Sequence, residues 1–307
     1  MNKSPVSATL KGTEVSAPDS FAHRVSSRLY TNTKLRLRLL IATPLLWLSL
    51  VYVAALLALF VTAFWTMDSF TGEIRAEWNL DNFVQLFTNS LYQTVTLRTL
   101  GIALMVTIAD ILLALPIAFF MAKVASPRMR GILVISILMP LWASYLVKAY
   151  AWRSVLSNEG ILQWLLRPLG LDTPGYSLVG AALTLGYIWL PYVILPIYTG
   201  LEKVPQNILE ASSDLGAKTW STLRLIVFPM LLPAIAAGSI FAFSLTMGDY
   251  ITINIVGGAT QMLGNLVYTN VGTANNLPMA AAIAMIPIAI MFIYLSVIRK
   301  TGALDNL

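Results

Sequence analysis

The sequence predicts an all-α membrane protein with six transmembrane helices, and three observations support this prediction. First, 57% of the 307 residues are hydrophobic and only 11% are charged, whereas soluble domains carry about a quarter charged residues. Second, six apolar runs reach the roughly 20 residues that a helix needs to span a bilayer. Third, Lys and Arg are divided unevenly between the two sets of connecting segments.

Polar segments that contain Gly or Pro separate the six predicted spans. The spans cover residues 39–65, 94–122, 132–152, 178–201, 225–247 and 277–298. With the N-terminus in the cytoplasm, fifteen of the 20 Lys and Arg residues lie on the inner side. Cytoplasmic loops are rich in Lys and Arg, so both termini are predicted to be cytoplasmic. The net charge of +6 is thus an orientation signal, and no nucleic-acid partner is expected.

Residues 1–38 are predicted to form a cytoplasmic tail, partly disordered because Ser, Thr and Ala prevail in it, and residues 301–307 a second, short tail. The first tail is too long, and the apolar run after it too extensive, for a cleaved signal peptide. It contains the single histidine, His23, which we expect to be solvated. The chain has no cysteine, so disulfides and thiolate sites are excluded, and neither a metal nor a bound cofactor is predicted.

The predicted outer segments contain short helix-like patches. Residues 81–87 carry apolar side chains at helical spacing behind Asp81, a residue type that caps helices. Residues 159–171 contain an amphipathic segment that Pro168 and Gly170 end. Residues 251–276 are rich in Gly, Thr and Asn and are predicted to form a loop. These segments either receive a periplasmic partner or merely connect helices.

A charged segment, residues 202–224, interrupts the apolar sequence between the fourth and fifth spans. One face of the helix predicted here is apolar, at Ile208, Ala211, Ser212 and Leu215. Glu210 and Asp214 lie on a more polar face, and Gly216 is predicted to end the helix because glycine adopts the left-handed cap conformation without strain. The pattern fits a helix that transmits a displacement from a partner protein to the fifth span. It also fits a plain amphipathic helix on the surface.

The stretch from residue 210 to residue 229 resembles the EAA signature of ABC importer permeases: Glu-Ala-Ala, three residues, Gly, nine residues, Ile, one residue, Leu-Pro. The matching positions hold Glu210, Ala211, Ser212, Gly216, Ile226, Phe228 and Pro229. Ser212 stands where the signature has its second alanine, and Phe228 where it has leucine. The resemblance implies the type I ABC importer permease fold over about residues 39–300, with a coupling helix in the 202–224 loop.

The resemblance also implies partners and roles. In that family the coupling helix docks on a cytoplasmic ATPase subunit, so Glu210 would meet a basic group, and Ala211 would allow close packing. Gly216 would permit the turn, and Asp214 and Ala217 complete the predicted coupling surface. The expected complex has two ATPase subunits, which bind ATP and Mg²⁺, a periplasmic substrate-binding protein and a second permease subunit, expected to be a homologous but different chain.

The chain itself is predicted to be a transport subunit of a bacterial inner membrane and not an enzyme. A Walker A loop requires glycine five positions before its last glycine. The sequence Gly216–Thr219 imitates only the end of such a loop, because Ala211 stands at that earlier position. ATP hydrolysis is therefore expected on a separate subunit.

The stretch Thr246–Gly258 resembles the sequence G-D-[YF]-V-T-P-x-L-V-G-G of the spermidine/putrescine subfamily of permeases. The matching residues are Gly248, Asp249, Tyr250, Thr252, Gly257 and Gly258, while Ile253 replaces the proline. The subfamily also includes systems for phosphonates, opine-like compounds and ferric iron. The resemblance therefore implies a polyamine or related organic cation as the first expectation, with these other solutes as alternatives.

Seven residues are candidates for the substrate pathway: Asp110, Lys148, Tyr187, Trp189, Tyr192, Asp249 and Tyr250. Asp110 lies within the second span, where an ionised group costs about 2.5–3.5 kcal/mol; it either pairs with Lys148 or meets a cationic substrate. Asp249 either caps a turn or meets a cationic substrate. The aromatic residues either pack or offer cation–π contacts to amines. An ion-coupled secondary transporter is the rival class, but its matching broken helices are not found.

Overall fold

The computed structural model describes residues 33–68 and 70–300, so the predictions for His23 and for both tails outside this range lie beyond the described residues. The chain divides into two units, Met1–Ala58 and Leu59–Leu307. Most of the described part is helical, and its only strands are the short β1 (Thr66–Met67) and β2 (Ile74–Arg75), which pair antiparallel. This agrees with the predicted all-α class.

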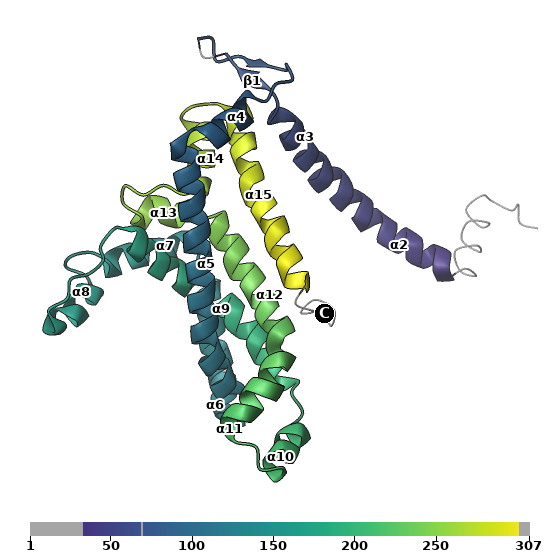
Figure 1. Cartoon of the computed structure of the whole chain (residues 1–307), viewed down its shortest axis with the longest axis vertical. Coiled ribbons are helices and arrows are strands. Elements are labelled where there is room, and N and C mark those ends of the chain that lie inside the picture. Colours follow the sequence, from purple (N-terminus) through teal and green to yellow (C-terminus); the bar gives the residue numbers. More distant parts are fainter. Residues whose placement is uncertain (1–32, 69, 301–307) are drawn as a thin grey trace, which may run out of the picture. The chain divides into compact units, whose positions relative to one another are not determined.

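The first unit consists of apolar helix. It contains α2 (Thr33–Leu48), the π-helical η1 (Ser49–Val53) and the start of α3 (Ala54–Thr62), drawn in purple and dark blue in Figure 1. Leu40–Thr62 is long and apolar enough to cross a membrane. All of the described side chains up to Ala58 are exposed. Such a helix buries its apolar surface in lipid or against another protein chain.

The second unit contains four more helical stretches that could cross a membrane. They are α5 (Ser90–Phe119) with the π-helical η2 (Phe120–Val124), α9 (Leu178–Glu202), α11 (Thr219–Thr222) with η4 (Leu223–Val227) and α12 (Phe228–Met247), and α15 (Leu277–Lys300). Together with the helix of the first unit they account for five of the six predicted spans. Each agrees with its predicted apolar run to within a few residues, apart from the fifth span, whose helix begins at Thr219 and not at residue 225.

The third predicted span is not one straight helix. It forms α6 (Pro127–Trp142) and α7 (Tyr145–Val155), which meet at 97°. The chain is extended at Ala143 and Ser144 between them. The second half carries Lys148, and a charged group is costly at the centre of a bilayer. The bent pair supplies a sixth span only if it is counted as one broken helix.

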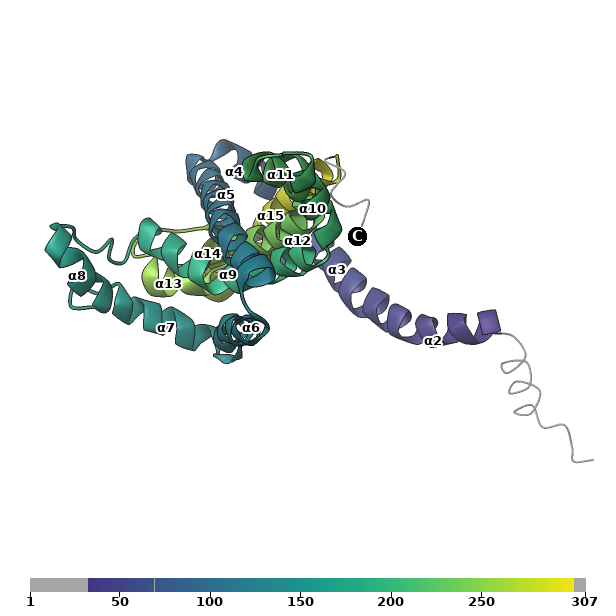
Figure 2. The same ribbon diagram turned by 90° about the horizontal axis from the view of Figure 1, so that it is seen from below.

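The core of the second unit is formed by α5, α9 and α12, which pack against one another along most of their lengths and lie side by side in both views (Figures 1 and 2). The buried side of α5 repeats at helical spacing, at Val95, Thr99, Ile102, Ala103, Val106, Thr107, Asp110, Ala114 and Ala118. This stripe is what a helix packed along one face requires. A second apolar cluster joins α15 to the ends of α5 and α12 through Phe243, Met279 and Ile283.

Short elements lie at the end of this unit away from α10 and along one side of it (Figure 1). Near that end are α4 (Asp81–Thr88), α13 (Ile251–Val256) and α14 (Leu263–Gly272), while α8 (Ile161–Leu166) with the 3-10 turn η3 (Arg167–Leu169) projects from the side. The prediction of a loop at 251–276 was therefore wrong, because two helices form there. The expected cap by Asp81 is also absent; Asn82 fixes α4 instead, since its amide donates to the carbonyls of Ala63 and Trp65 at 3.0 and 2.9 Å.

Gly200 allows a close contact between α9 and α12. A Cβ atom at this position would lie 2.6 Å from the Cβ of Ala234 and 3.3 Å from Cδ2 of Leu231. Small residues allow helix backbones to approach closely in membranes. The two helices are thus held together where they are nearest to α10.

We expect Gly200→Ala to destabilise the protein by about 1–3 kcal/mol, because the added methyl group overpacks this contact. Thermal unfolding of the purified protein would measure the effect. Gly101→Ala is the matched control, since a Cβ there meets nothing within 4 Å. Ala234→Gly is expected to restore the stability of Gly200→Ala. Equal melting temperatures for Gly200→Ala and Gly101→Ala would contradict the contact.

Candidate functional site

A short exposed helix, α10 (Gln206–Asp214), lies at the end of the second unit opposite α14 (Figure 1). It ends at Gly216, whose φ of +74° is left-handed. The N–H groups of Gly216 and Ala217 donate to the carbonyls of Ser213 and Ser212 at 2.9 and 3.1 Å. This Schellman arrangement satisfies the terminal carbonyls, so the glycine ends the helix as the sequence predicts.

The two sides of α10 differ in exposure. Ser212 is buried, and Ile208 and Leu209 are half-buried against the rest of the chain. The other side is exposed, at Glu210, Ala211, Asp214 and Leu215. The residues of the predicted apolar face are not buried together, since Ala211 is exposed and Leu215, 88% exposed, follows the last helical residue. The exposed side carries two carboxylates and an apolar side chain that a partner could cover.

Ser212 explains one departure from the EAA signature. Its Oγ lies 2.8 Å from the Oγ1 of Thr222, at the end of α11. An alanine at this position cannot make this hydrogen bond. The two hydroxyl groups therefore tie α10 to the helix that follows it.

This following helix runs on into the fifth span. α11, η4 and α12 form one helical stretch over Thr219–Met247. Pro229 cannot donate a backbone hydrogen bond to the preceding turn, and η4 occupies that turn with the wider π-helical pattern. α10 is consequently joined to a spanning helix by both the chain and the Ser212–Thr222 bond.

Asp110 lies in the packed face of α5 and is 1% exposed. Its Oδ1 is only 3.2 Å from where a Cβ at Gly186 of α9 would lie, so the glycine leaves room for the carboxyl group. Within the described residues, neither of its oxygens has a hydrogen-bond partner. Lys148 of α7 is also buried. The alternative of an Asp110–Lys148 pair is therefore wrong for this structure, since neither ion pair found among the described residues includes them.

Asp249 lies in the connection between α12 and α13 and is 7% exposed. Its Oδ1 accepts a hydrogen bond from the N–H of Thr252 at 2.9 Å. Its Oδ2 accepts one from the hydroxyl of Tyr145, which also lies 2.5 Å from the Oγ1 of Thr252. Burial raises the pKa of Asp249 to about 6, while the backbone N–H groups of Thr252 and Ile253 act in the opposite direction. The carboxyl group thus holds the first turn of α13, as the alternative of a turn residue predicts.

Tyr145 was not predicted from the sequence. It begins α7 and reaches a carboxyl group 104 residues further along the chain. Its local sequence reads as part of an apolar span and contains no signal of this contact. Only the break before α7 brings the hydroxyl to Asp249.

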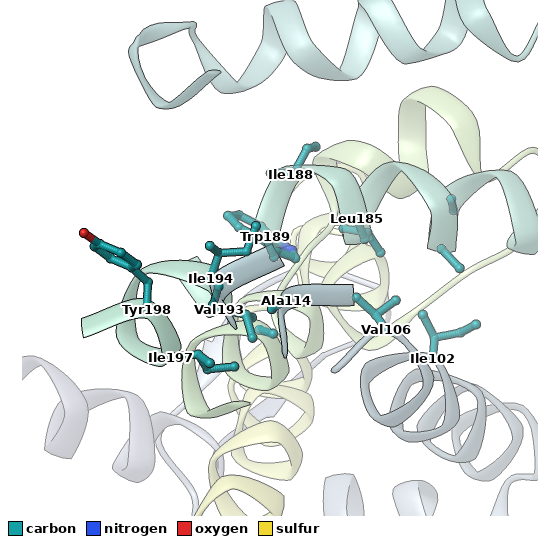
Figure 3. Packing of buried hydrophobic residues seen from close by; sticks show 14 of the residues in the cluster. Ile102, Val106, Ala114, Leu185, Ile188, Trp189, Val193, Ile194, Ile197 and Tyr198 are labelled. Carbon is teal, nitrogen blue, oxygen red and sulfur yellow. The ribbon is translucent and has the colours of Figure 1, made fainter. Parts of the chain in front are cut away.

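Aromatic rings continue from Tyr145 along α9 and on to α12. The ring centroids of Tyr145 and Trp189 are 5.7 Å apart, those of Trp189 and Tyr192 5.9 Å, and those of Tyr192 and Phe241 6.3 Å. Figure 3 shows Trp189 among the apolar residues that surround it. Its indole Nε1 is buried without a hydrogen-bond partner among the described residues. The structure therefore brings Trp189 and Tyr192 into one series with the Asp249 carboxyl group.

The remaining two predicted aromatic residues lie apart from this series. Tyr187 packs on Trp152, with ring centroids 5.4 Å apart. Tyr250 stacks on Tyr268 at 4.9 Å, and both line a pocket of about 410 Å³ between the end of α12, α14 and α15. Tyr268 was also missed, because its segment was expected to be a loop.

Comparisons with known proteins agree on one family. The model described as "Binding-protein-dependent transport system inner membrane component" matches residues 22–301. The chain is 42% identical over 299 residues to the inner membrane ABC transporter permease protein YdcU of Escherichia coli (strain K12), covering 92% of this chain and 95% of that one. It is 31% identical over 272 residues to the spermidine/putrescine transport system permease protein PotB of the same organism, covering 87% and 98%.

A solved structure shares the fold. A bacterial ABC transporter involved in the import of the acidic polysaccharide alginate superposes with a TM-score of 0.66 at 15% identity, over 90% of this chain and 99% of that one. The predicted permease fold, the inner-membrane location and the non-enzymatic class are confirmed, and the secondary-transporter alternative falls. The chain belongs to the inner-membrane permease components of binding-protein-dependent ABC transport systems.

Proposed function

We propose that this ABC importer permease moves a polyamine, such as putrescine or spermidine, or a related small organic cation. The observation that carries the proposal is the Asp249 carboxyl group at one end of the aromatic series Tyr145–Trp189–Tyr192. A carboxylate attracts an ammonium group, and aromatic faces attract a desolvated cation. The 31% identity to a spermidine/putrescine permease supports the same substrate class.

The proposed pathway includes Asp110 only at a later stage of transport. Asp110 is enclosed between α5 and α9, opposite Gly186. A passing cation reaches its carboxyl group only in a state in which these helices have moved apart. Tyr250 and Tyr187, on the exposed sides of the fold, are proposed to meet the substrate outside the enclosed part.

In the proposed mechanism α10 is the element that the ATPase subunits move. Its exposed side, with Glu210, Ala211 and Asp214, docks on a cytoplasmic ATPase subunit, and Gly216 and Ala217 complete the docking turn. ATP and Mg²⁺ bind the ATPase subunits and not this chain. Closure of the ATPase pair displaces α10, and α11 with η4 passes the displacement into α12. Both termini then lie in the cytoplasm.

The proposed complex contains two permease subunits, two ATPase subunits and a periplasmic substrate-binding protein. The second permease subunit is proposed to be a homologous, different chain. The lipid-length helix Leu40–Thr62, which carries no buried residue within the chain, offers the apolar surface that such an assembly or the surrounding lipid would cover.

One observation favours a different substrate within the same class of importer. Lys148 is buried and has no ion-pair partner among the described residues. An unpaired ammonium group suits an anionic solute, such as an opine-like conjugate or an aminophosphonate. Ferric iron is the further alternative that the sequence resemblance left open.

The substrate is tested by ATP hydrolysis in nanodiscs that contain the complete complex and its binding protein. The ligands are putrescine, spermidine, an aminophosphonate, an opine-like conjugate and ferric iron. Stimulation by the polyamines alone is the expected result. Stimulation only by an anionic ligand would overturn the cation assignment and retain the importer.

We expect Glu210→Lys to leave the protein inserted but to uncouple ATP hydrolysis from transport, because a lysine would face the basic group proposed for the ATPase. Charge reversal at a desolvated contact costs about 2–5 kcal/mol, so we expect at least roughly a tenfold loss of transport. Uptake into proteoliposomes and ATP hydrolysis are measured together. Glu77→Lys, an exposed reversal far from α10 in the sequence, is the control. Normal uptake by Glu210→Lys would contradict the docking assignment.

We expect Asp249→Asn to raise the polyamine concentration needed for half-maximal uptake by roughly 10- to 100-fold, because a charge-assisted contact contributes about 1.5–3 kcal/mol. Asparagine keeps one oxygen that can accept from the N–H of Thr252, and its amide NH2 can donate to the hydroxyl of Tyr145, so the fold should persist. Tyr145→Phe, which keeps the ring and the stacking on Trp189, is expected to have a smaller effect. An unchanged half-saturation for Asp249→Asn would remove this carboxylate from the pathway.

A further inference from the structure

A group of polar contacts joins the end of α5 to the bend between α9 and α10. The Nζ of Lys123, in η2, donates to the carbonyl of Val204 at 2.9 Å. Arg130, in the first turns of α6, donates from Nε to the carbonyl of Met121 at 3.1 Å and from its second terminal nitrogen to that of Ala122 at 2.8 Å. These residues come from segments up to 81 positions apart.

The remaining guanidinium nitrogen reaches the last residue of α9. It lies 3.4 Å from the Oε1 of Glu202, and the hydroxyl of Tyr198 donates to the same oxygen at 2.5 Å. Figure 3 shows this hydroxyl directed away from the apolar cluster. We call the set Lys123, Arg130, Tyr198 and Glu202 the polar clamp.

Lys123 and Arg130 of the polar clamp donate hydrogen bonds to carbonyl groups that have no partner within their helices. The last carbonyls of a helix have no N–H partner within it, and cations are favoured at that end by the helix dipole. Met121 and Ala122 are in the terminal turn of α5 with η2, and Val204 directly precedes Pro205 in the bend before α10. The planar fork of arginine can bind several acceptors at once, which lysine cannot.

The carbonyl bonds are the stronger part of the clamp. The Arg130 and Glu202 side chains are 36% and 39% exposed, and an exposed ion pair at 3.4 Å contributes little. The bonds to the carbonyls of Val204, Met121 and Ala122 are partly buried. Hydrogen bonds with a charged donor are roughly twice as strong as neutral ones. Loss of Lys123 and Arg130 should therefore matter more than loss of Glu202.

We propose that the polar clamp is a second coupling route, which carries the displacement of α10 into α5 through Lys123 and Arg130. The inference rests on the proposed docking of α10 on an ATPase subunit. The residues at 203–205 form a bend between two helices. If this bend flexes when α10 is displaced, the displacement does not reach the neighbouring helices. With the Val204 carbonyl fixed to Lys123, and Glu202 to Arg130, the bend moves with α5 instead.

The clamp therefore predicts that α10 and the α5–α6 turn move as one body. The chain contains no cysteine, so spin labels at Gln206→Cys and Arg128→Cys, both exposed, report one distance when the partner subunits are cysteine-free. Double electron–electron resonance on the complete complex should give a narrow distribution that is the same without nucleotide and with ATP and vanadate. In the variant Lys123→Met with Arg130→Met, the distribution should broaden and change with nucleotide.

A functional measurement separates coupling from stability. Stimulation of ATP hydrolysis by binding protein and spermidine should fall by roughly fivefold or more in Lys123→Met with Arg130→Met, because couplings between sites typically amount to about 5- to 150-fold. Basal hydrolysis should remain. Arg130→Lys keeps the charge but not the fork, so it should lose part of the stimulation. Arg128→Met, an exposed cation of the same helix, should behave as the parent.

The outcomes distinguish the clamp from the proposed function. If the clamp variants show the parent's distance distributions in both nucleotide states, the clamp inference is overturned and the importer assignment is untouched. If the double variant does not assemble, Lys123→Met alone and Arg130→Lys are measured in the same way, and parental distances and stimulation in both overturn it equally. A parent complex that hydrolyses no ATP with any partner overturns the docking of α10 itself. The resonance measurement needs ATP and vanadate but no transport substrate, so it tests the clamp whatever the substrate is.

Discussion

Backbone carbonyl groups at helix ends determine how this permease is organised at the α10 end. A helix leaves its last carbonyls without partners within it, and carbonyls that are shielded from water need donors from elsewhere in the protein. Here the carbonyls of Met121 and Ala122, in the η2 turn that follows α5, accept hydrogen bonds from the guanidinium of Arg130. The carbonyl of Val204, in the bend after α9, accepts one from the amine of Lys123. α10 ends on its own Schellman turn at Gly216. The groups that satisfy the helix ends are the same groups that connect one helix to the next.

Two separate sets of contacts connect the α10 region to the packed helices of the second unit. One runs through the Ser212–Thr222 bond and α11 into α12, and the other through Lys123 and Arg130 into α5. α5, α9 and α12 are themselves packed closely, with Gly200 of α9 in tight contact with Ala234 of α12. A displacement that enters at α10 therefore meets a packed group of helices and not a single flexible loop.

The other end of the fold uses polar side chains differently. Asn265 donates to the Oδ1 of Asn254 at 2.7 Å and accepts from the N–H of Met262 at 3.1 Å, so the turns around α13 and α14 are held by side chains. Asp249 holds the first turn of α13 separately, through the N–H of Thr252. Among the described residues, Asp110 and the indole of Trp189 are buried but unpaired. Buried unpaired groups are rare in folded proteins and require an explanation, and a polar substrate or a change in helix packing would supply partners for both.

Local sequence pattern determined most of the secondary structure of this protein, because span length, helical spacing and glycine caps depend only on neighbouring residues. The apolar runs and the end of α10 at Gly216 are of this kind. Tertiary structure alone decided the 97° break between α6 and α7, which brings Tyr145 to Asp249, and the contact of Lys123 with Val204. It also decided that Asp110 faces Gly186 and not Lys148. These contacts join residues some 70 to 100 positions apart, and a side chain's partner at that separation is set by how whole helices pack, which local periodicity does not encode.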